Sequence, residues 1–125
     1  MPELPEVETV VRGLRNTIVG EKVMGLEVPW EKALVAEDPY ESIVGKDITG
    51  VSRRAKYIII ELDKGFLLVH LRMTGKLTPV YPEKHVTVIL HFESGSSLYF
   101  QDTRKFGRME YVEDLQNTLG HIGPE

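Results

Sequence analysis

Residues 57–71, YIIIELDKGFLLVHL, give the clearest indication of how this chain folds. Two runs rich in β-branched and large apolar residues, 57–62 and 66–71, flank Asp63-Lys64-Gly65. Strand-forming runs joined by a short turn that contains Gly are typical of a β-hairpin. The stretch therefore predicts two neighbouring antiparallel strands.

Similar patterns lie on both sides of this hairpin. Further strands are predicted over 22–28, 48–54, 86–93, 97–101 and 108–112. Glu93-Ser94-Gly95-Ser96 indicates a second hairpin, whereas the acidic segment 30–42 is interpreted as a loop or short turn. About seven or eight strands predict a mainly β fold, an antiparallel β-sandwich with flanking helices.

Helices are predicted near both ends of the chain. Over 4–19, apolar side chains recur at steps of three and four residues, which indicates one buried stripe. That stripe consists of Leu4, Val7, Val11, Leu14 and Ile18. Pro5 is tolerated in a first helical turn and Gly20 suits a helix end. A short C-terminal helix is predicted over 114–119.

The composition is typical of one globular domain. The chain has 125 residues, of which 42% are hydrophobic and 27% charged. It has no Cys, which excludes a disulfide or a thiolate metal site and fits a cytoplasmic location. No apolar run approaches the roughly 18 residues of a membrane span. We therefore expect no membrane association and no metal or cofactor bound within the chain.

The net charge of −4 hides an uneven distribution. Residues 1–52 carry a net charge of −5, residues 53–108 carry +5, and residues 109–125 carry −4. A concentrated basic segment is typical of phosphate binding, although a solvated basic strand surface would give the same count. The overall acidity therefore does not exclude a nucleic-acid partner.

The chain begins Met1-Pro2-Glu3-Leu4-Pro5-Glu6. Removal of Met1 would leave Pro2 as a secondary amine, which attacks an aldehyde-level carbon and forms an iminium cation that acts as an electron sink. Glu3 is placed to move protons, and Glu6 lies in the first predicted helical turn, where the helix dipole favours a carboxylate. The alternative is that the two prolines only begin a helix.

Basic motifs fall within the positive segment. Arg53-Arg54-Ala55-Lys56-Tyr57 begins a strand, where its cations suit phosphate contact and Lys56 a catalytic role; the alternative is a basic edge that prevents aggregation. His70-Leu71-Arg72-Met73-Thr74-Gly75-Lys76 alternates cations with apolar residues before a Thr-Gly turn. Met73 at this turn is either an apolar wedge that enters duplex DNA or a core side chain.

A last motif, Asp102-Thr103-Arg104-Lys105-Phe106-Gly107-Arg108, interleaves cations with one aromatic residue. This pattern suits phosphate contact combined with stacking; the alternative is a charged turn with a core Phe. Asp102 is expected either to hold Arg104 or to cap the turn. Separately, His85 lies in a polar loop within reach of a phosphate.

In their order and spacing, MPELPEVE, RRAKY, HLRMTG, KH, DTRKFG and HIGPE resemble bacterial formamidopyrimidine-DNA glycosylase over the whole chain. Leu4 is similar to the formamidopyrimidine branch, since the related endonuclease VIII branch usually has Gly there. The chain departs from the pattern at Thr103, where Pro is usual, at Lys105, where Arg is usual, and after His85, where a second His is often present.

The resemblance implies a base-excision repair enzyme. It would remove oxidised purines, 8-oxoguanine and formamidopyrimidines, from damaged double-stranded DNA and then cut the abasic strand by β-elimination. Pro2 would attack C1′ of the damaged nucleotide, Glu3 would donate the proton that opens the sugar, and Glu6 would help to organise the N-terminus. Lys56 would contact the phosphate of the lesion and donate a proton for the elimination.

The resemblance also implies a DNA-binding surface. Met73, Arg104 and Phe106 would fill the gap left by the flipped-out nucleotide, and Arg104 would hold the orphaned partner base. His85 would contact the DNA backbone, and His70 is assigned to the same surface.

The resemblance covers residues 1–125 as an N-terminal catalytic domain. The second half of the family, with a helix–two-turn–helix, a four-Cys zinc finger holding one structural zinc and an Arg for δ-elimination, is not in this sequence. We expect a monomeric fragment that is inactive or only weakly DNA-binding, and retention of Met1 would also block Pro2. The alternatives are a tautomerase with Pro2 as general base and a non-catalytic module that binds damaged DNA.

Overall fold

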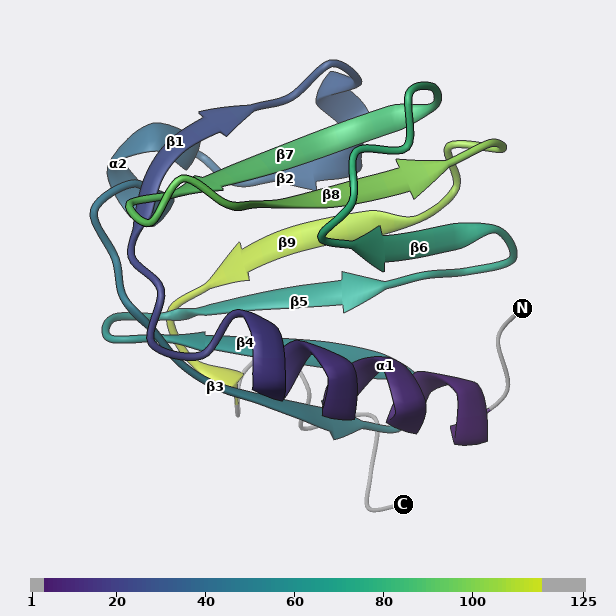
Figure 1. Ribbon diagram of the computed structural model, residues 1–125, viewed down its shortest axis with the longest axis horizontal. Helices are drawn as coiled ribbons and strands as arrows, with labels where there is room; N and C mark the ends of the chain where they lie inside the picture. Colours follow the sequence, from purple (N-terminus) through teal and green to yellow (C-terminus); the bar gives the residue numbers. More distant parts are fainter. Residues whose placement is uncertain (1–3, 116–125) are drawn as a thin grey trace.

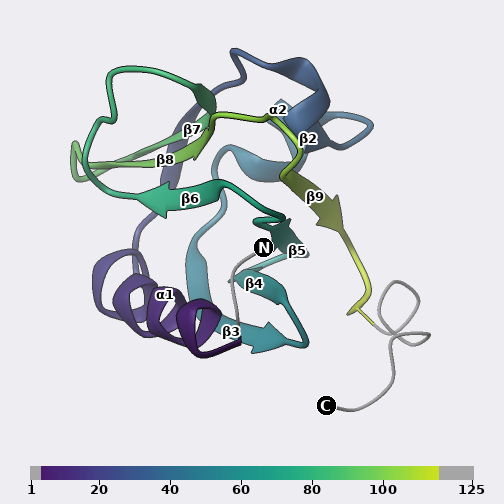
Figure 2. The ribbon, with the colours of Figure 1, turned by 90° about the vertical axis from the view of Figure 1, so that its right-hand side faces the viewer.

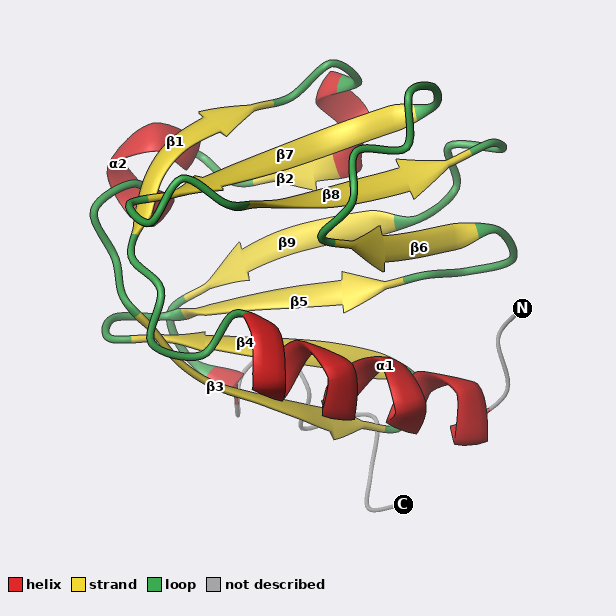
Figure 3. Ribbon diagram, viewed as in Figure 1, coloured by secondary structure: helices red, strands yellow, loops and turns green. Residues whose placement is uncertain are grey.

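The computed structural model describes residues 4–115, which form two β-sheets packed face to face with a helix along one side (Figure 1). Helical segments are α1 (Leu4–Thr17), η1 (Glu31–Ala33) and α2 (Pro39–Ile43). The strands are β1 (Val23–Glu27), β2 (Leu34–Val35), β3 (Ile48–Arg54), β4 (Tyr57–Leu62), β5 (Phe66–His70), β6 (Gly75–Thr78), β7 (Val86–Phe92), β8 (Ser97–Asp102) and β9 (Arg108–Val112). The predicted sandwich is confirmed (Figure 3).

The hairpin predicted over 57–71 is confirmed as β4 and β5. These strands pair antiparallel from Tyr57 opposite His70 to Glu61 opposite Phe66. They lie inside the five-stranded sheet, whose order is β2-β9-β5-β4-β3. A central position buries both faces of a strand, which explains why both runs are almost continuously apolar.

The four-stranded sheet has the order β1-β7-β8-β6. The second predicted hairpin is confirmed as β7 and β8, whereas β6 begins at Gly75, where the sequence indicated a turn. The chain reverses before that point, because the amide of Gly75 donates to the carbonyl of Leu71 at 2.9 Å. A Cβ at Gly75 would lie 2.5 Å from this carbonyl oxygen, so the turn requires Gly.

The interpretation of 30–42 as a loop was wrong in part. This segment contains η1, the two-residue strand β2 and the five-residue helix α2. β2 pairs parallel with β9, so one pair in an otherwise antiparallel sandwich departs from the expected arrangement. Elements of two to five residues are too short to show a hydrophobic period, and tertiary packing decides their conformation.

Helix α1 lies alongside the β3 edge of the five-stranded sheet (Figure 2). The predicted apolar stripe is buried at Val7, Val11, Leu14 and Ile18. Two polar contacts add to this packing: Arg53 Nε lies 3.1 Å from Glu8 Oε1, and Arg15 Nε donates to the carbonyl of Val51 at 2.7 Å. These two contacts therefore hold α1 against β3.

The described residues contain no helix long and apolar enough to cross a membrane. The short helix predicted over 114–119 lies almost entirely outside the described residues.

Candidate functional site

A loop over residues 102–107 joins β8 to β9, and a buried carboxylate organises it. Asp102 is only 1% exposed and accepts hydrogen bonds from the amide of Gly107 at 2.6 Å and the amide of Arg104 at 3.1 Å. The Thr74 hydroxyl also donates to Asp102 and thereby joins this loop to the β5–β6 turn. Asp102 therefore caps the turn, one of the two roles expected for it.

Gly107 closes the loop against the core. A Cβ at this position would lie 2.7 Å from Phe100 Cζ and 2.9 Å from Asp102 Oδ2. Both distances are too short for any side chain, so this position needs Gly because of its close approach. The two ends of the loop are thus fixed, and the residues between them project outward.

Met73, Arg104 and Phe106 come together at the tips of the two joined loops. Met73 is 53% exposed and Phe106 is 52% exposed, which excludes the alternative that they are core side chains. Arg104 Nη1 lies 3.8 Å from Met73 Sδ. The two motifs that carry these residues therefore lie next to each other on the surface.

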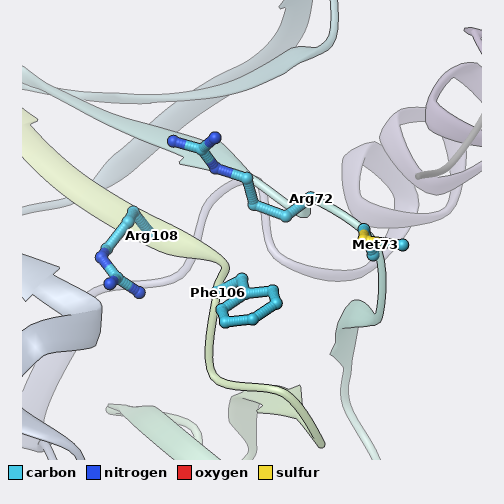
Figure 4. Close-up of a pocket in the computed structure, with 4 residues that line it drawn as sticks. All are labelled: Arg72, Met73, Phe106 and Arg108. Carbon is cyan, nitrogen blue, oxygen red and sulfur yellow. The ribbon is translucent and has the colours of Figure 1, made fainter.

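Beside this cluster is a pocket of about 390 Å³ (Figure 4). Its lining consists of Arg72, Met73, Phe106 and Arg108. Figure 4 shows the Phe106 ring lying between Arg108 and the Arg72–Met73 turn. An exposed aromatic ring flanked by guanidinium groups suits a ligand that has both flat bases and phosphates.

A second pocket joins this surface to the start of α1. It is lined by Glu6 and Val10 from α1 and by residues of the β5–β6 turn and β6, Met73 among them. Glu6 is thus placed on the same face as the exposed Met73. Pro2 and Glu3 lie outside the described residues; in the sequence they immediately precede Leu4, the first residue of α1.

Lys56 lies in the tight turn between β3 and β4, next to Ala55, whose backbone is left-handed with φ of 53°. Arg53, from the same motif, makes contacts within the fold. It donates a hydrogen bond to Glu8 and another to the carbonyl of Ala55 at 2.9 Å. Arg53 is therefore structural. It connects the Lys56 turn to the first turns of α1.

His70 ends β5 next to this turn. Its Nδ1 accepts a hydrogen bond from the amide of Arg72 at 3.0 Å, and its ring packs edge-on against Tyr57 at 5.1 Å. Burial lowers the pKa of His70 below its usual value, and the positive charges of Arg72 and Lys56 lower it further. Neutral His70 with an acceptor at Nδ1 carries its proton on Nε2, which can donate to a phosphate.

Acidification is expected to destabilise the fold through His70. Because the folded chain holds the pKa of His70 below its usual value, the unfolded chain takes up this proton first, and the free energy of unfolding falls as the pH drops below about 6.5. In His70→Asn an amide oxygen replaces Nδ1 as acceptor, so this part of the pH dependence should disappear. Urea denaturation of the wild type and of His70→Asn at about pH 7.5 and about pH 5 measures the effect. If both proteins lost the same free energy of unfolding between these pH values, the prediction would be contradicted.

His85 is exposed at the end of the loop before β7, with a left-handed backbone of φ 62°. Its carbonyl accepts a hydrogen bond from the amide of Asp102 at 2.9 Å. The loop that carries His85 is therefore attached to the start of the 102–107 loop.

Met73 and Phe106 thus line one pocket together with Arg72 and Arg108, two residues that were not among the predicted site residues. Both residues stood in basic motifs, but nothing in their spacing indicated that they would face the same pocket. Lys105 also contacts Trp30, which lies 75 positions earlier in the chain. No sequence signal predicted this contact.

The model of the formamidopyrimidine-DNA glycosylase N-terminal domain matches residues 1–109. Identity is 43% to the formamidopyrimidine-DNA glycosylase of Protochlamydia amoebophila and 44% to that of Latilactobacillus sakei, each over the whole chain and 49% of the relative. The chain therefore spans about half the length of these relatives.

Solved structures of a Lactococcus lactis protein have the same fold. One is a complex with DNA that contains FAPY-dG; it is 37% identical, has a TM-score of 0.86, and the match covers 96% of this chain and 48% of that one. Another is the formamidopyrimidine-DNA glycosylase bound non-covalently to DNA with an AP site. It is 35% identical, has a TM-score of 0.86, and the match covers 97% of this chain and 49% of that one. Together with the match over residues 1–109, these likenesses show that the chain belongs to the formamidopyrimidine-DNA glycosylase family.

Proposed function

We propose that this chain is the catalytic half of a DNA glycosylase and abasic-site lyase that removes oxidised purines. The observation that carries the proposal is the exposed cluster of Met73, Arg104 and Phe106, which faces the same side as Glu6 in the first turn of α1. Membership of the family supports this assignment, as do the relatives solved with DNA that contains FAPY-dG or an AP site.

In this proposal the nucleophile is the nitrogen of Pro2, once Met1 has been removed. Its lone pair forms a bond to C1′ of the damaged nucleotide, and the electrons of the glycosidic bond leave with the base. The proton that the Pro2 nitrogen then loses goes to the departing base. Glu3 donates a proton to the sugar ring oxygen as the ring opens, which leaves an iminium between Pro2 and C1′.

The iminium then makes strand cleavage possible. It withdraws electrons from C2′, so a C2′ proton becomes acidic and its loss expels the 3′-phosphate by β-elimination. We propose Lys56 as the group that binds the phosphate of the lesion and donates a proton during this step. The packing of Arg53 against Glu8 supports this role, because it holds the Lys56 turn near the first turns of α1.

DNA binding is proposed to combine wedging with phosphate contact. Met73 and Phe106 are exposed apolar tips of a size that fits between base steps, and Arg104 beside them has donors for the unpaired partner base. His70, His85 and Lys56 are proposed to contact phosphates. The partner is a damaged duplex.

Two expectations concern the part of the relatives that this chain does not span. We propose that the relatives' second half supplies the other wall of the DNA cleft, and that the structural zinc of the family belongs to that half. The 125-residue chain alone is then expected to be monomeric, to bind duplexes weakly and to have negligible glycosylase activity.

Excision by the complete gene product tests the proposal. A duplex with one 8-oxoguanine should be cut at the lesion without added cofactor, whereas the matched duplex with guanine should stay intact. Release of the base without strand cleavage would contradict the lyase step. Failure to act on either 8-oxoguanine or formamidopyrimidine would contradict the assigned substrate class.

Removal of the wedge, the exposed side chains of Met73 and Phe106, is expected to weaken DNA binding without changing its salt dependence. Met73→Ala combined with Phe106→Ala should cost about 1–3 kcal/mol of affinity for an abasic-site duplex, because base contacts of this kind contribute that much. Lys56→Met should instead lower the slope of log K against log salt by about 0.9. Fluorescence anisotropy between about 50 and 200 mM salt measures both; a changed slope in the wedge variant would contradict the assignment.

A further inference from the structure

We propose that Trp30 and Lys105 form a positioning pair that holds the 102–107 loop in the conformation in which Arg104 and Phe106 project toward DNA. The Lys105 ammonium lies over the Trp30 ring, 5.0 Å from its centroid. A cation at this distance from the face of an indole is attracted by the ring electrons. The inference rests on the proposed binding of a damaged duplex.

Trp30 is a rigid platform for this contact. Its amide donates to the carbonyl of Thr87 in β7 at 3.3 Å, and its carbonyl accepts from the amide of Ala33 at 2.9 Å. Thr87 is itself buried and donates to the carbonyl of Phe100 in β8 at 3.0 Å. The backbone of Trp30 is therefore attached to the four-stranded sheet, and the residue remains 37% exposed with Lys105 over its ring.

Lys105 needs such support because its backbone is strained. Its φ of 61° is left-handed, a conformation that residues with a side chain rarely adopt. Its carbonyl accepts from Arg108 Nη1 at 2.8 Å, which fixes the peptide between Lys105 and Phe106. The contact with Trp30 fixes Lys105 between its two neighbours in the chain. Arg104 on one side contacts Met73, and Phe106 on the other side lines the pocket.

The alternative role for Lys105 is direct phosphate contact, which its position in a basic motif would suggest. The two roles predict different effects of salt and different coupling to Trp30. A phosphate contact contributes to the salt slope and is independent of the indole, whereas a positioning pair contributes no released counterion and loses its function when either member is removed.

Fluorescence of the 125-residue chain tests the contact itself, because Trp30 is its only Trp. Lys105→Ala should increase quenching of the indole by neutral acrylamide, since the ring loses its cover, and Lys105→Arg should restore the original quenching. Lys32→Ala is the matched control, because it removes an exposed Lys two residues from the indole. Unchanged quenching in Lys105→Ala would overturn the contact.

Binding of an abasic-site duplex at low salt tests the positioning role. Trp30→Leu and Lys105→Met should each weaken binding by about two- to fivefold, the double variant should be no weaker than either single one, and the salt slope should not change. Additive effects, or a slope lowered by about 0.9 in Lys105→Met alone, would overturn positioning in favour of phosphate contact. If the unsubstituted chain bound no duplex, its proposed DNA binding and the positioning role would both fail, while quenching would still report the pair.

Discussion

Asp102→Ala is expected to destabilise the domain by about 3 kcal/mol and to abolish preferential binding of a duplex with an abasic site. The substitution removes the acceptor that the amides of Arg104 and Gly107 and the Thr74 hydroxyl share, and it leaves the amide of Gly107 without a partner in a buried place. A buried donor without a partner costs about 1–3 kcal/mol. The loss should spread to binding, because the same carboxylate joins the two loops that carry Met73 and Phe106.

Urea denaturation and duplex binding together check this expectation. Asp102→Asn keeps the shape and one acceptor, so it should lie between the wild type and Asp102→Ala in both measurements. Thr103→Ala is the matched control in the same loop, since this residue is exposed. If the free energy of unfolding of Asp102→Ala lay within about 0.5 kcal/mol of the wild-type value, the carboxylate would not organise the loop.

In the complete gene product, blocking the amine of Pro2 is expected to reduce lesion excision by roughly three orders of magnitude or more, as removal of a nucleophile does in other enzymes. A protein that retains Met1 carries an amide at Pro2, whose lone pair is delocalised and does not attack carbon. Duplex binding should be almost unchanged, because the wedge and phosphate contacts lie elsewhere. The loss should therefore appear in single-turnover excision and not in affinity.

The matched control is Pro5→Ala in the same segment. It removes the other proline of the first turn of α1 and leaves the N-terminal amine intact, so excision should stay within a few-fold of the wild type. Intact mass identifies which form, with or without Met1, is present in each preparation. Full activity in a protein shown to retain Met1 would exclude Pro2 as the nucleophile.

The helices and strands that could be predicted from the sequence are those long enough to show a hydrophobic period or a continuous apolar run. The stripe of α1 and the hairpins β4–β5 and β7–β8 have this property, and all three are confirmed. β6 was missed because its start at Gly75 has the chemistry of a turn, and β2 was missed because two residues show no period. These strands are defined by partners distant in the chain, which a single sequence does not show.

Residue type alone left Met73 and Phe106 open between exposed and core side chains. Only the resemblance assigned them, with Arg104, to a DNA-binding surface, and the structure shows both side chains exposed. What holds these residues in place was only partly predictable. The cap at Asp102 was one of two expected roles, whereas the attachment of Arg53 to Glu8 and of Lys105 to Trp30 depends on how distant strands and helices pack.

We propose that the N-terminal amine of this chain becomes covalently attached to damaged DNA. Borohydride reduction during turnover of an 8-oxoguanine duplex by the complete gene product, followed by peptide mapping of the adduct, tests it most directly. We predict one trapped adduct, on the peptide that begins at Pro2, and none with the undamaged duplex. An adduct on a lysine instead, or cleavage that proceeds with no trapped adduct, would contradict the account.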